Sequence, residues 1–209
     1  MEKKKASKQG IKKVRKISPF KLRRAVFHIL LGTSIIFLSL FYSKAVFVLF
    51  YMLLAGIVLS LLSLRFKIPG IWFMIRHFEY YRYIKELPGK SALFFFAGCL
   101  LALKLFPQQI ALASIAILTF GDPTTSLVSA LSKRRYRKPF NTLKNFYGTI
   151  AGIIVSFFAA LFFVPWKFAI VAAIAAMISE AFIIDIGSDT VDDNLVVPLV
   201  AGTVLYLLM

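Results

Sequence analysis

Seven long apolar blocks constrain the fold of this 209-residue chain more than any other feature. A helix needs about 20 mainly apolar residues to cross the hydrocarbon core of a bilayer. The blocks lack the alternation of apolar and polar residues that the strands of an outer-membrane barrel would show. They lie at residues 25–43, 45–64, 91–103, 105–120, 149–166, 168–184 and 195–209. The sequence therefore predicts an all-α, polytopic membrane protein with about seven transmembrane helices.

The composition excludes a soluble enzyme and an intrinsically disordered chain. Hydrophobic residues make up 59% of the chain and charged residues 17%, whereas soluble proteins average about 25% charged residues. Only Lys104 separates the third and fourth blocks, and we expect its ammonium group to lie at a membrane interface between two spans. Six crossings are the alternative, if a single helix over 91–120 buries this lysine. Cys99 is the only cysteine, so the sequence predicts no disulfide and no cysteine metal motif.

The basic residues predict the orientation of the chain. Eleven of the 26 Lys and Arg residues precede residue 25, and the 65–90 and 121–148 connections hold six each. The other connections hold one each, at Lys44, Lys104 and Lys167. Because cytoplasmic loops collect Lys and Arg, the N-terminus is predicted to be cytoplasmic and, with seven spans, the C-terminus external. The same bias accounts for the net charge of +17 without a nucleic-acid partner.

Two segments outside the spans have their own composition. Residues 1–22 form a basic cytoplasmic tail, predicted to be disordered or to lie on anionic headgroups, and residues 23–209 form a single transmembrane catalytic domain. Residues 71–86 interleave aromatic side chains with Arg76, Arg82 and Lys85. This pattern is typical of an amphipathic helix that lies in the membrane interface.

The acidic residues indicate where the chemistry lies. Five of the nine fall in one short stretch, and Asp122 stands alone after an apolar run. The five are Glu180, Asp185, Asp189, Asp192 and Asp193. On the predicted topology, both regions lie at the cytoplasmic side, together with the basic 133–144 loop. Carboxylates hold hard cations and basic side chains offset phosphate charge, so the combination indicates a magnesium–nucleotide site.

Structural roles compete with this interpretation. The last three acids of the stretch can simply solvate a loop, whereas Glu180 and Asp185 continue an apolar helix, where an acid is costly and indicates function. Asp122 before Pro123 can cap the start of a helix as well as act chemically. His28 lies one helical turn after Arg24 and can be a plain interface anchor. The basic residues at 133–138 can serve only to set the orientation of the chain in the membrane.

Five segments together resemble the polyprenol kinase family, which includes dolichol kinase, phytol kinase and the CTP-dependent diacylglycerol kinase. The segments are LRRAVFHILLG, LPGKSALFFFAGCLLAL, FGDPTTSLVSAL, KNFYGTIAG and SEAFIIDIGSDTVDDNLVVPL. The matching residues are Arg24, His28, Gly89, Lys90, Gly121, Asp122, Ser126, Lys144, Gly148, Thr149, Glu180, Asp193, Asn194 and Pro198. The resemblance covers about residues 23–209 and extends to the wider group of CTP-using membrane transferases that includes phosphatidate cytidylyltransferase.

Three positions depart from the family pattern. Ala25 stands in place of a lysine, and no glycine occurs near Ala130. Tyr147 stands where the family usually has a glutamate before Gly148. The loss of this carboxylate is compatible with altered metal use, another acceptor or reduced activity.

The resemblance implies a kinase that transfers the γ-phosphoryl group of CTP to the hydroxyl of a membrane lipid alcohol. It implies that Asp122, Asp192 and Asp193 bind Mg²⁺. Glu180 or Asp185, or else His28, would accept the hydroxyl proton. The residues expected around the nucleotide are Arg24, Ser126, Lys133, Lys138, Lys144, Gly148, Thr149 and Asn194. We expect a multi-pass protein of a prokaryotic plasma membrane with its active site facing the cytoplasm.

Two other functions fit the same sequence. A cytidylyltransferase would use the same nucleotide and metal, take a lipid phosphate as nucleophile and release pyrophosphate. The Pro-Gly-His-Gly-Gly element typical of those enzymes is absent, which favours the kinase. A transporter or non-catalytic helper would use the acids as an ion path, but acids gathered at one face argue against it.

Overall fold

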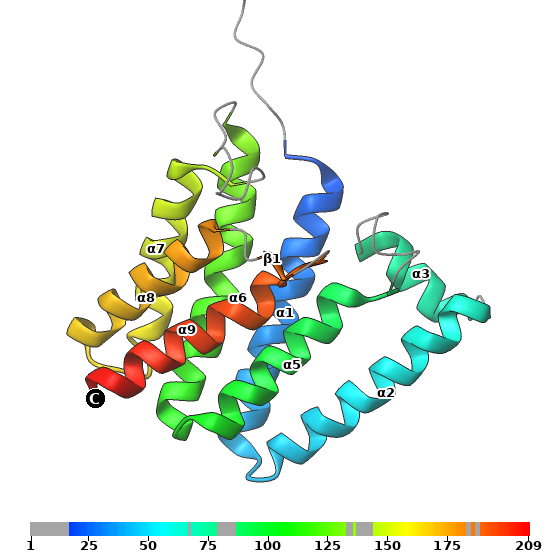
Figure 1. Cartoon of the computed structure of the whole chain (residues 1–209), viewed down its shortest axis with the longest axis horizontal. Helices are drawn as coiled ribbons and strands as arrows, with labels where there is room; N and C mark the ends of the chain where they lie inside the picture. The colour runs from blue at the N-terminus through cyan, green and yellow to red at the C-terminus, as the bar shows by residue number, and fades with distance from the viewer. Residues whose placement is uncertain are drawn as a thin grey trace, which may run out of the picture.

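The described part of the chain is helical apart from short connections and one pair of two-residue strands. The structure, a computed structural model, describes residues 17–66, 68–78, 87–132, 136, 144–182, 185–186 and 189–209. The helices, shown in Figure 1, are α1 (Pro19–Phe41), α2 (Ala45–Arg65), α3 (Pro69–Phe78), α5 (Lys90–Leu105), α6 (Gln108–Leu131), α7 (Phe146–Ala160), α8 (Trp166–Ala181) and α9 (Asp193–Leu208). Strands β1 (Asp185–Ile186) and β2 (Asp189–Thr190) pair antiparallel between α8 and α9.

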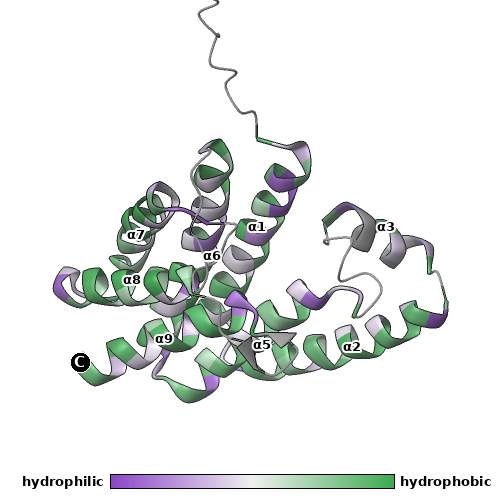
Figure 2. Cartoon of the chain, turned by 45° about the horizontal axis from the view of Figure 1, so that its top comes forward, coloured by the Kyte–Doolittle hydropathy of each residue, from purple (hydrophilic) through white to green (hydrophobic). Residues whose placement is uncertain are grey.

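Each of the seven apolar blocks coincides with a helix, which confirms the helical architecture. By length and hydropathy, α1, α2 and α6 are long and apolar enough to cross a membrane. Helices α5, α7, α8 and α9 have 15 or 16 residues, fewer than the roughly 20 of a perpendicular crossing. In Figure 2, much of the helical ribbon has the colour of hydrophobic residues. The structure thus supports a helical protein with apolar helices suited to a membrane.

The segment around Lys104 forms two helices, as predicted, rather than one. Lys104 lies in the last turn of α5, and the chain leaves the helix at Phe106 and Pro107 before α6 begins. Proline has no N–H to donate and disfavours helical conformation in the residue before it. The single helix over 91–120 is therefore excluded.

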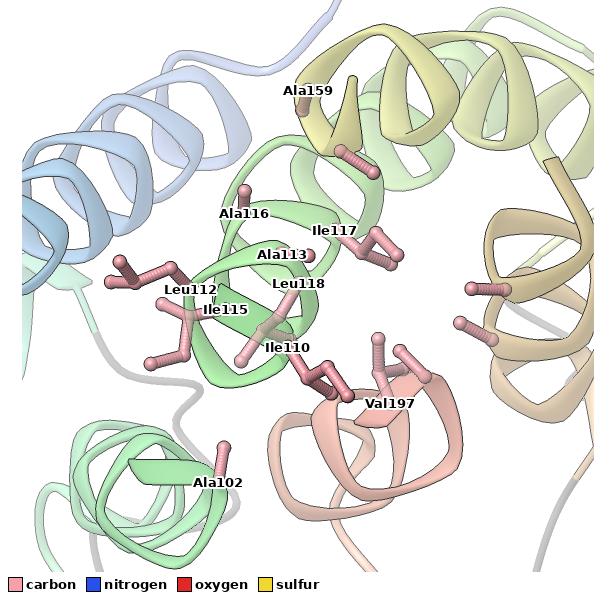
Figure 3. Close-up of a cluster of buried hydrophobic side chains, with 14 of the residues drawn as sticks. Ala102, Ile110, Leu112, Ala113, Ile115, Ala116, Ile117, Leu118, Ala159 and Val197 are labelled. Carbon is pink, nitrogen blue, oxygen red and sulfur yellow. The ribbon is translucent and has the colours of Figure 1, made fainter. Parts of the chain in front are cut away.

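Helix α6 forms the centre of the molecule. It packs against α1, α5, α7, α8 and α9, whereas α2 lies at the edge and packs mainly against α5 (Figure 1). In Figure 3, side chains from Ile110 to Leu118 of α6 lie between Ala159 of α7, Val197 of α9 and Ala102 of α5. Small side chains at these contacts let the helix backbones approach closely.

The prediction that Asp122 and Pro123 begin a helix is wrong. Helix α6 runs without interruption to Leu131, with Pro123 inside it. Proline removes one backbone hydrogen bond, but hydroxyl groups beside it bond to the helix backbone. Thr124 donates to the carbonyl of Phe120 at 2.7 Å, and Thr125 donates to the carbonyl of Gly121 at 3.0 Å. Asp122 is therefore held on a buried helix rather than in a loop.

The peripheral segments are described in part. Helix α1 begins at Pro19, with Ser18 as its N-cap, while residues 1–16 of the predicted tail lie outside the described residues. Helix α3 covers the first half of the predicted amphipathic helix, and residues 79–86 lie outside the description. Phe78 of α3 packs against Phe27 of α1, with ring centroids 4.8 Å apart, so α3 is attached to the helical body.

Candidate functional site

A buried ion-pair cluster joins α6, α8 and Lys144, which precedes the N-cap of α7. The Nζ atom of Lys144 donates to Oδ1 of Asp122 at 2.8 Å, to Oγ of Ser126 at 3.2 Å and to Oε1 of Glu180. Asp122 and Ser126 lie one turn apart on α6, and Glu180 lies in the last turn of α8. Lys144 is 4% exposed and Glu180 is fully buried. One ammonium group thus holds two carboxylates together inside the protein.

The electrostatics of the cluster keep Lys144 charged. Burial alone lowers the pKa of its ammonium group, because a charge is poorly solvated inside a protein. The nearby carboxylates of Asp122, Glu180 and Asp193 outweigh that effect and raise the pKa of Lys144 above its ordinary value. The neighbouring carboxylates therefore favour the charged form of Lys144.

Asp193 completes a group of three carboxylates. One oxygen each from Asp122, Glu180 and Asp193 lie within 4.8 Å of one another. The second oxygen of Glu180, Oε2, is buried and has no hydrogen-bond partner among the residues that the structure describes. Mg²⁺ prefers hard oxygen ligands. By donor type, these three residues could therefore hold a divalent cation.

Asp192 caps the start of α9 in the structure. Its Oδ1 atom accepts the backbone N–H of Asn194 at 3.0 Å and the side-chain amide of Asn194 at 2.7 Å, as the N-cap of α9. Burial raises the pKa of the Asp192 carboxyl, and the hydrogen bonds from Asn194 oppose that rise. The structure thus groups Glu180, rather than Asp192, with Asp122 and Asp193.

His28 and Arg24 of α1 lie beside the cluster. The Nδ1 atom of His28 is 3.8 Å from Oδ2 of Asp122, and its ring meets Phe95 of α5 edge-on with centroids 4.5 Å apart. Arg24, one turn earlier, donates from Nη2 to the hydroxyl of Ser91 at 3.2 Å. The family-like segment at the start of α1 therefore faces the carboxylates.

Two cavities meet at these two residues. The larger, about 270 Å³, lies between α1, α2, α3, α5 and the start of α9 and is lined mainly by apolar side chains. The smaller, about 30 Å³, is lined by Asp122, Ser126, Pro123, Lys21 and Ala25. Arg24 and His28 line both cavities. A ligand with an apolar part and a charged part could be bound across this junction.

Gly148 and Thr149 are engaged in structure rather than free to bind a nucleotide. The N–H of Gly148 donates to Oδ1 of Asn145 at 2.8 Å, and the hydroxyl of Thr149 donates to the carbonyl of Asn145 at 3.2 Å. Asn145 also donates from its backbone N–H and its side-chain amide to Ser129, each at 3.1 Å. This N-cap of α7 places Lys144 in the cluster. The sequence analysis did not identify Asn145 as the N-cap, although an asparagine just before an apolar run is an N-cap signal.

We expect Gly148→Ala to destabilise the protein. A Cβ atom at this position would overlap the Ser129 hydroxyl and lie 2.7 Å from the carbonyl oxygen of Thr125, which is backbone and cannot yield easily. The substitution should push α7 away from α6 and cost about 1–3 kcal/mol. Thermal unfolding in detergent measures the effect. Gly70→Ala is the matched control, because nothing lies within 4 Å of a Cβ there. Equal melting temperatures for the two variants would contradict the close α6–α7 contact.

Tyr147 does not take a ligand position in the cluster. Its side chain is 58% exposed, whereas Lys144, Asn145 and Gly148 are all buried. A glutamate on the same backbone would also begin on the exposed side of α7. The departure from the family pattern at this residue therefore leaves the three-carboxylate group intact.

The structure brings together most of the site residues proposed from the sequence. The cluster contains Asp122, Ser126, Lys144, Glu180 and Asp193. His28 lies beside it, and Arg24 and Asn194 line the adjoining cavity. Lys133 and Lys138 lie outside the described residues, and Asp185 is described only as part of the backbone of β1. In comparisons with known proteins, the chain matches no family model, no curated protein and no solved structure.

Proposed function

We propose that this chain is a CTP-dependent lipid kinase. It transfers the γ-phosphoryl group of CTP to the hydroxyl of a membrane lipid alcohol and releases CDP. The observation that carries the proposal is the junction at Arg24 and His28, where a largely apolar cavity adjoins a smaller one beside the carboxylate–ammonium cluster. An apolar lipid tail and a water-soluble polyanion can meet there. The choice of CTP rests on the resemblance of the five segments to polyprenol kinases.

The proposed topology has seven crossings, with the N-terminus and the active site at the cytoplasmic side of a prokaryotic plasma membrane. The distribution of Lys and Arg supports this orientation. Residues 121–148 and 180–194, which carry the cluster, then lie on the side where nucleotides are available. Four of the crossing helices are short, and a short span is accommodated by local thinning of the bilayer.

The carboxylates of Asp122, Glu180 and Asp193 would hold Mg²⁺, which, when bound, offsets the charge of the phosphates. Lys144 holds Asp122 and Glu180 in place and adds a positive charge to the cluster. Lys21 and Arg24 line the smaller cavity and supply further positive charge. Phosphoryl transfer depends mainly on such positioning and charge stabilisation.

His28 is the proposed base. The acceptor hydroxyl lies at the junction of the cavities and donates its proton to Nε2 of His28, while the Asp122 carboxylate, 3.8 Å from Nδ1, stabilises the imidazolium by its charge. The hydroxyl oxygen forms a bond to the γ-phosphorus as the bond from that phosphorus to the β–γ bridging oxygen breaks. The products are the lipid monophosphate and CDP. Glu180 is fully buried and lines neither cavity, and its contact with Lys144 holds that ammonium group in place.

Two parallel reactions test the proposal. Purified full-length protein in detergent, with Mg²⁺ and a panel of lipid alcohols and lipid phosphates, receives CTP labelled at either the γ- or the α-phosphate. Label transferred from the γ position to lipid is the expected result. Label transferred from the α position would identify a cytidylyltransferase and overturn the kinase. Transfer of neither label, in a sample that remains folded, would favour a non-enzyme.

A further inference from the structure

The ammonium group of Lys144 lies among the carboxylates that could hold a divalent cation. Its Nζ atom is 2.8 Å from Oδ1 of Asp122 and also contacts Oε1 of Glu180. The negative charge of Asp193, the third member of the group, also stabilises the ammonium group. Two of the three carboxylates thus already have a positively charged partner in direct contact.

One ammonium group does not fully compensate these carboxylates. The Glu180 side chain is fully buried, and its Oε2 atom has no hydrogen-bond partner in the part of the chain that the structure describes. A single positive charge offsets only one of three ionised carboxylates. Because an uncompensated charge is costly inside a protein, a divalent cation is a stronger counter-ion for this group than one ammonium.

The ammonium group and a divalent cation need the same carboxylates at different distances. An ammonium–carboxylate contact is about 2.8 Å long, whereas Mg²⁺ binds its oxygen ligands at about 2.1 Å. The carboxylates must therefore move closer together around a metal, and the space that Nζ of Lys144 occupies against Asp122 and Glu180 is then lost. Two cations at such a short separation also repel each other. The carboxylate group consequently holds either the ammonium or the metal.

The smaller cavity offers the ammonium group a second position. Nζ of Lys144 also donates to Oγ of Ser126 at 3.2 Å, and Ser126 lines this cavity together with Asp122. The backbone beside Lys144 is fixed, because Asn145 caps α7 and bonds to Ser129 of α6. The four-carbon stem of a lysine is flexible, so the ammonium group can turn toward the cavity while the helices stay in place.

We propose that Lys144 is an internal counter-ion that a divalent cation displaces from Asp122 and Glu180. The displaced ammonium group turns toward Ser126 and the smaller cavity, where it can pair with an anionic group such as a phosphate. Entry of the cation and release of the ammonium group are then coupled, so cation binding prepares the site for a polyanion. For its role in catalysis this inference rests on the proposed function, but the exchange itself needs neither nucleotide nor lipid.

Binding of Mn²⁺ tests the competition. Mn²⁺ favours the same oxygen ligands as Mg²⁺, and electron paramagnetic resonance measures its free concentration. Nucleotide-free, full-length Lys144→Met in detergent should bind Mn²⁺ at least about tenfold more tightly than the wild type, because no ammonium group has to be displaced. Lys44→Met, at an exposed lysine before α2, is the matched control and should bind Mn²⁺ like the wild type. Equal affinities of Lys144→Met and the wild type, or no binding by either, would overturn the inference.

A double variant verifies where Mn²⁺ binds. Lys144→Met with Asp193→Asn lacks one of the three grouped carboxylates, so it should lose most of the gain in affinity. A double variant that keeps the full gain would place the cation elsewhere in the protein and contradict the exchange.

Chemical modification of the wild type tests the displacement itself and does not depend on the folding of a variant. Reductive methylation with formaldehyde and cyanoborohydride, followed by peptide mass spectrometry, reports the reactivity of each lysine. Lys144 is 4% exposed and ion-paired, so it should react slowly without metal. When Mn²⁺ fills the site, its methylation should rise severalfold, while that of the exposed Lys44 and Lys167 should not change. Unchanged reactivity of Lys144 with the site filled would show that both cations coexist, and would reject the displacement.

The two proposals fail separately. Displacement of Lys144 by Mn²⁺ without any transfer from CTP would support the exchange and reject the kinase. Transfer from γ-labelled CTP to lipid, with Lys144 equally unreactive before and after Mn²⁺ binding, would support the kinase and reject the exchange.

Discussion

Asp122→Asn is expected to reduce the rate of phosphoryl transfer about 10³-fold, the effect of losing one preorganised charged group at a reacting centre. The substitution keeps the shape of the side chain but removes the negative charge that faces both Lys144 and His28. It also removes one of three grouped carboxylates. Transfer from γ-labelled CTP to lipid measures kcat, and thermal unfolding in detergent verifies that the variant remains folded.

Asp192→Asn is the matched control for this prediction. Asp192 caps α9 by accepting hydrogen bonds from Asn194, and asparagine is an equally good N-cap. The rate should therefore remain within about threefold of the wild type. Full turnover by Asp122→Asn together with loss of turnover by Asp192→Asn would reverse the assignment, and would restore Asp192 as the ligand that the sequence resemblance implied.

Lys144→Met is expected to lower the free energy of unfolding by about 3–5 kcal/mol, because it leaves the buried carboxylate of Glu180 and the half-buried carboxylate of Asp122 without their cation. Both carboxylates, on Asp122 and Glu180, contact the Lys144 ammonium group directly. For a chain of this size the melting temperature should fall by on the order of 10 °C. Turnover should also be lost, since the same ammonium group positions Asp122.

A double variant separates the missing charge from a mere loss of packing. Lys144→Met with Glu180→Gln removes one of the two uncompensated carboxylates, so it should be more stable than Lys144→Met alone, and the coupling follows from a double-mutant cycle. Lys44→Met, at an exposed lysine before α2, is the control and should unfold like the wild type. A wild-type melting temperature for Lys144→Met would show that the cluster contributes no net stability.

Part of the site could be predicted because its chemistry is local. Glu180 stands out as an acid at the end of an apolar helix, and Asp122 stands out as a single acid after an apolar run. Lys144 and His28 were recognised only through the segments that resemble polyprenol kinases. Asn145 carries a local N-cap signal that was missed, whereas its hydrogen bonds to Ser129 are a contact with another helix that no pattern within one helix predicts.

The sequence by itself determined where the helices lie, since hydropathy over about 20 residues is a local property and each of the seven apolar blocks coincides with a helix. It also determined which residues are charged within apolar surroundings. Only the tertiary structure decided which of these charges meet. Asp192 and Asp193 are neighbours in the chain, yet one caps α9 while the other joins Asp122 and Glu180. The difference arises because the packing of α9 against α5, α6 and α8 sets the direction of each side chain at the start of α9, and no local pattern encodes that packing.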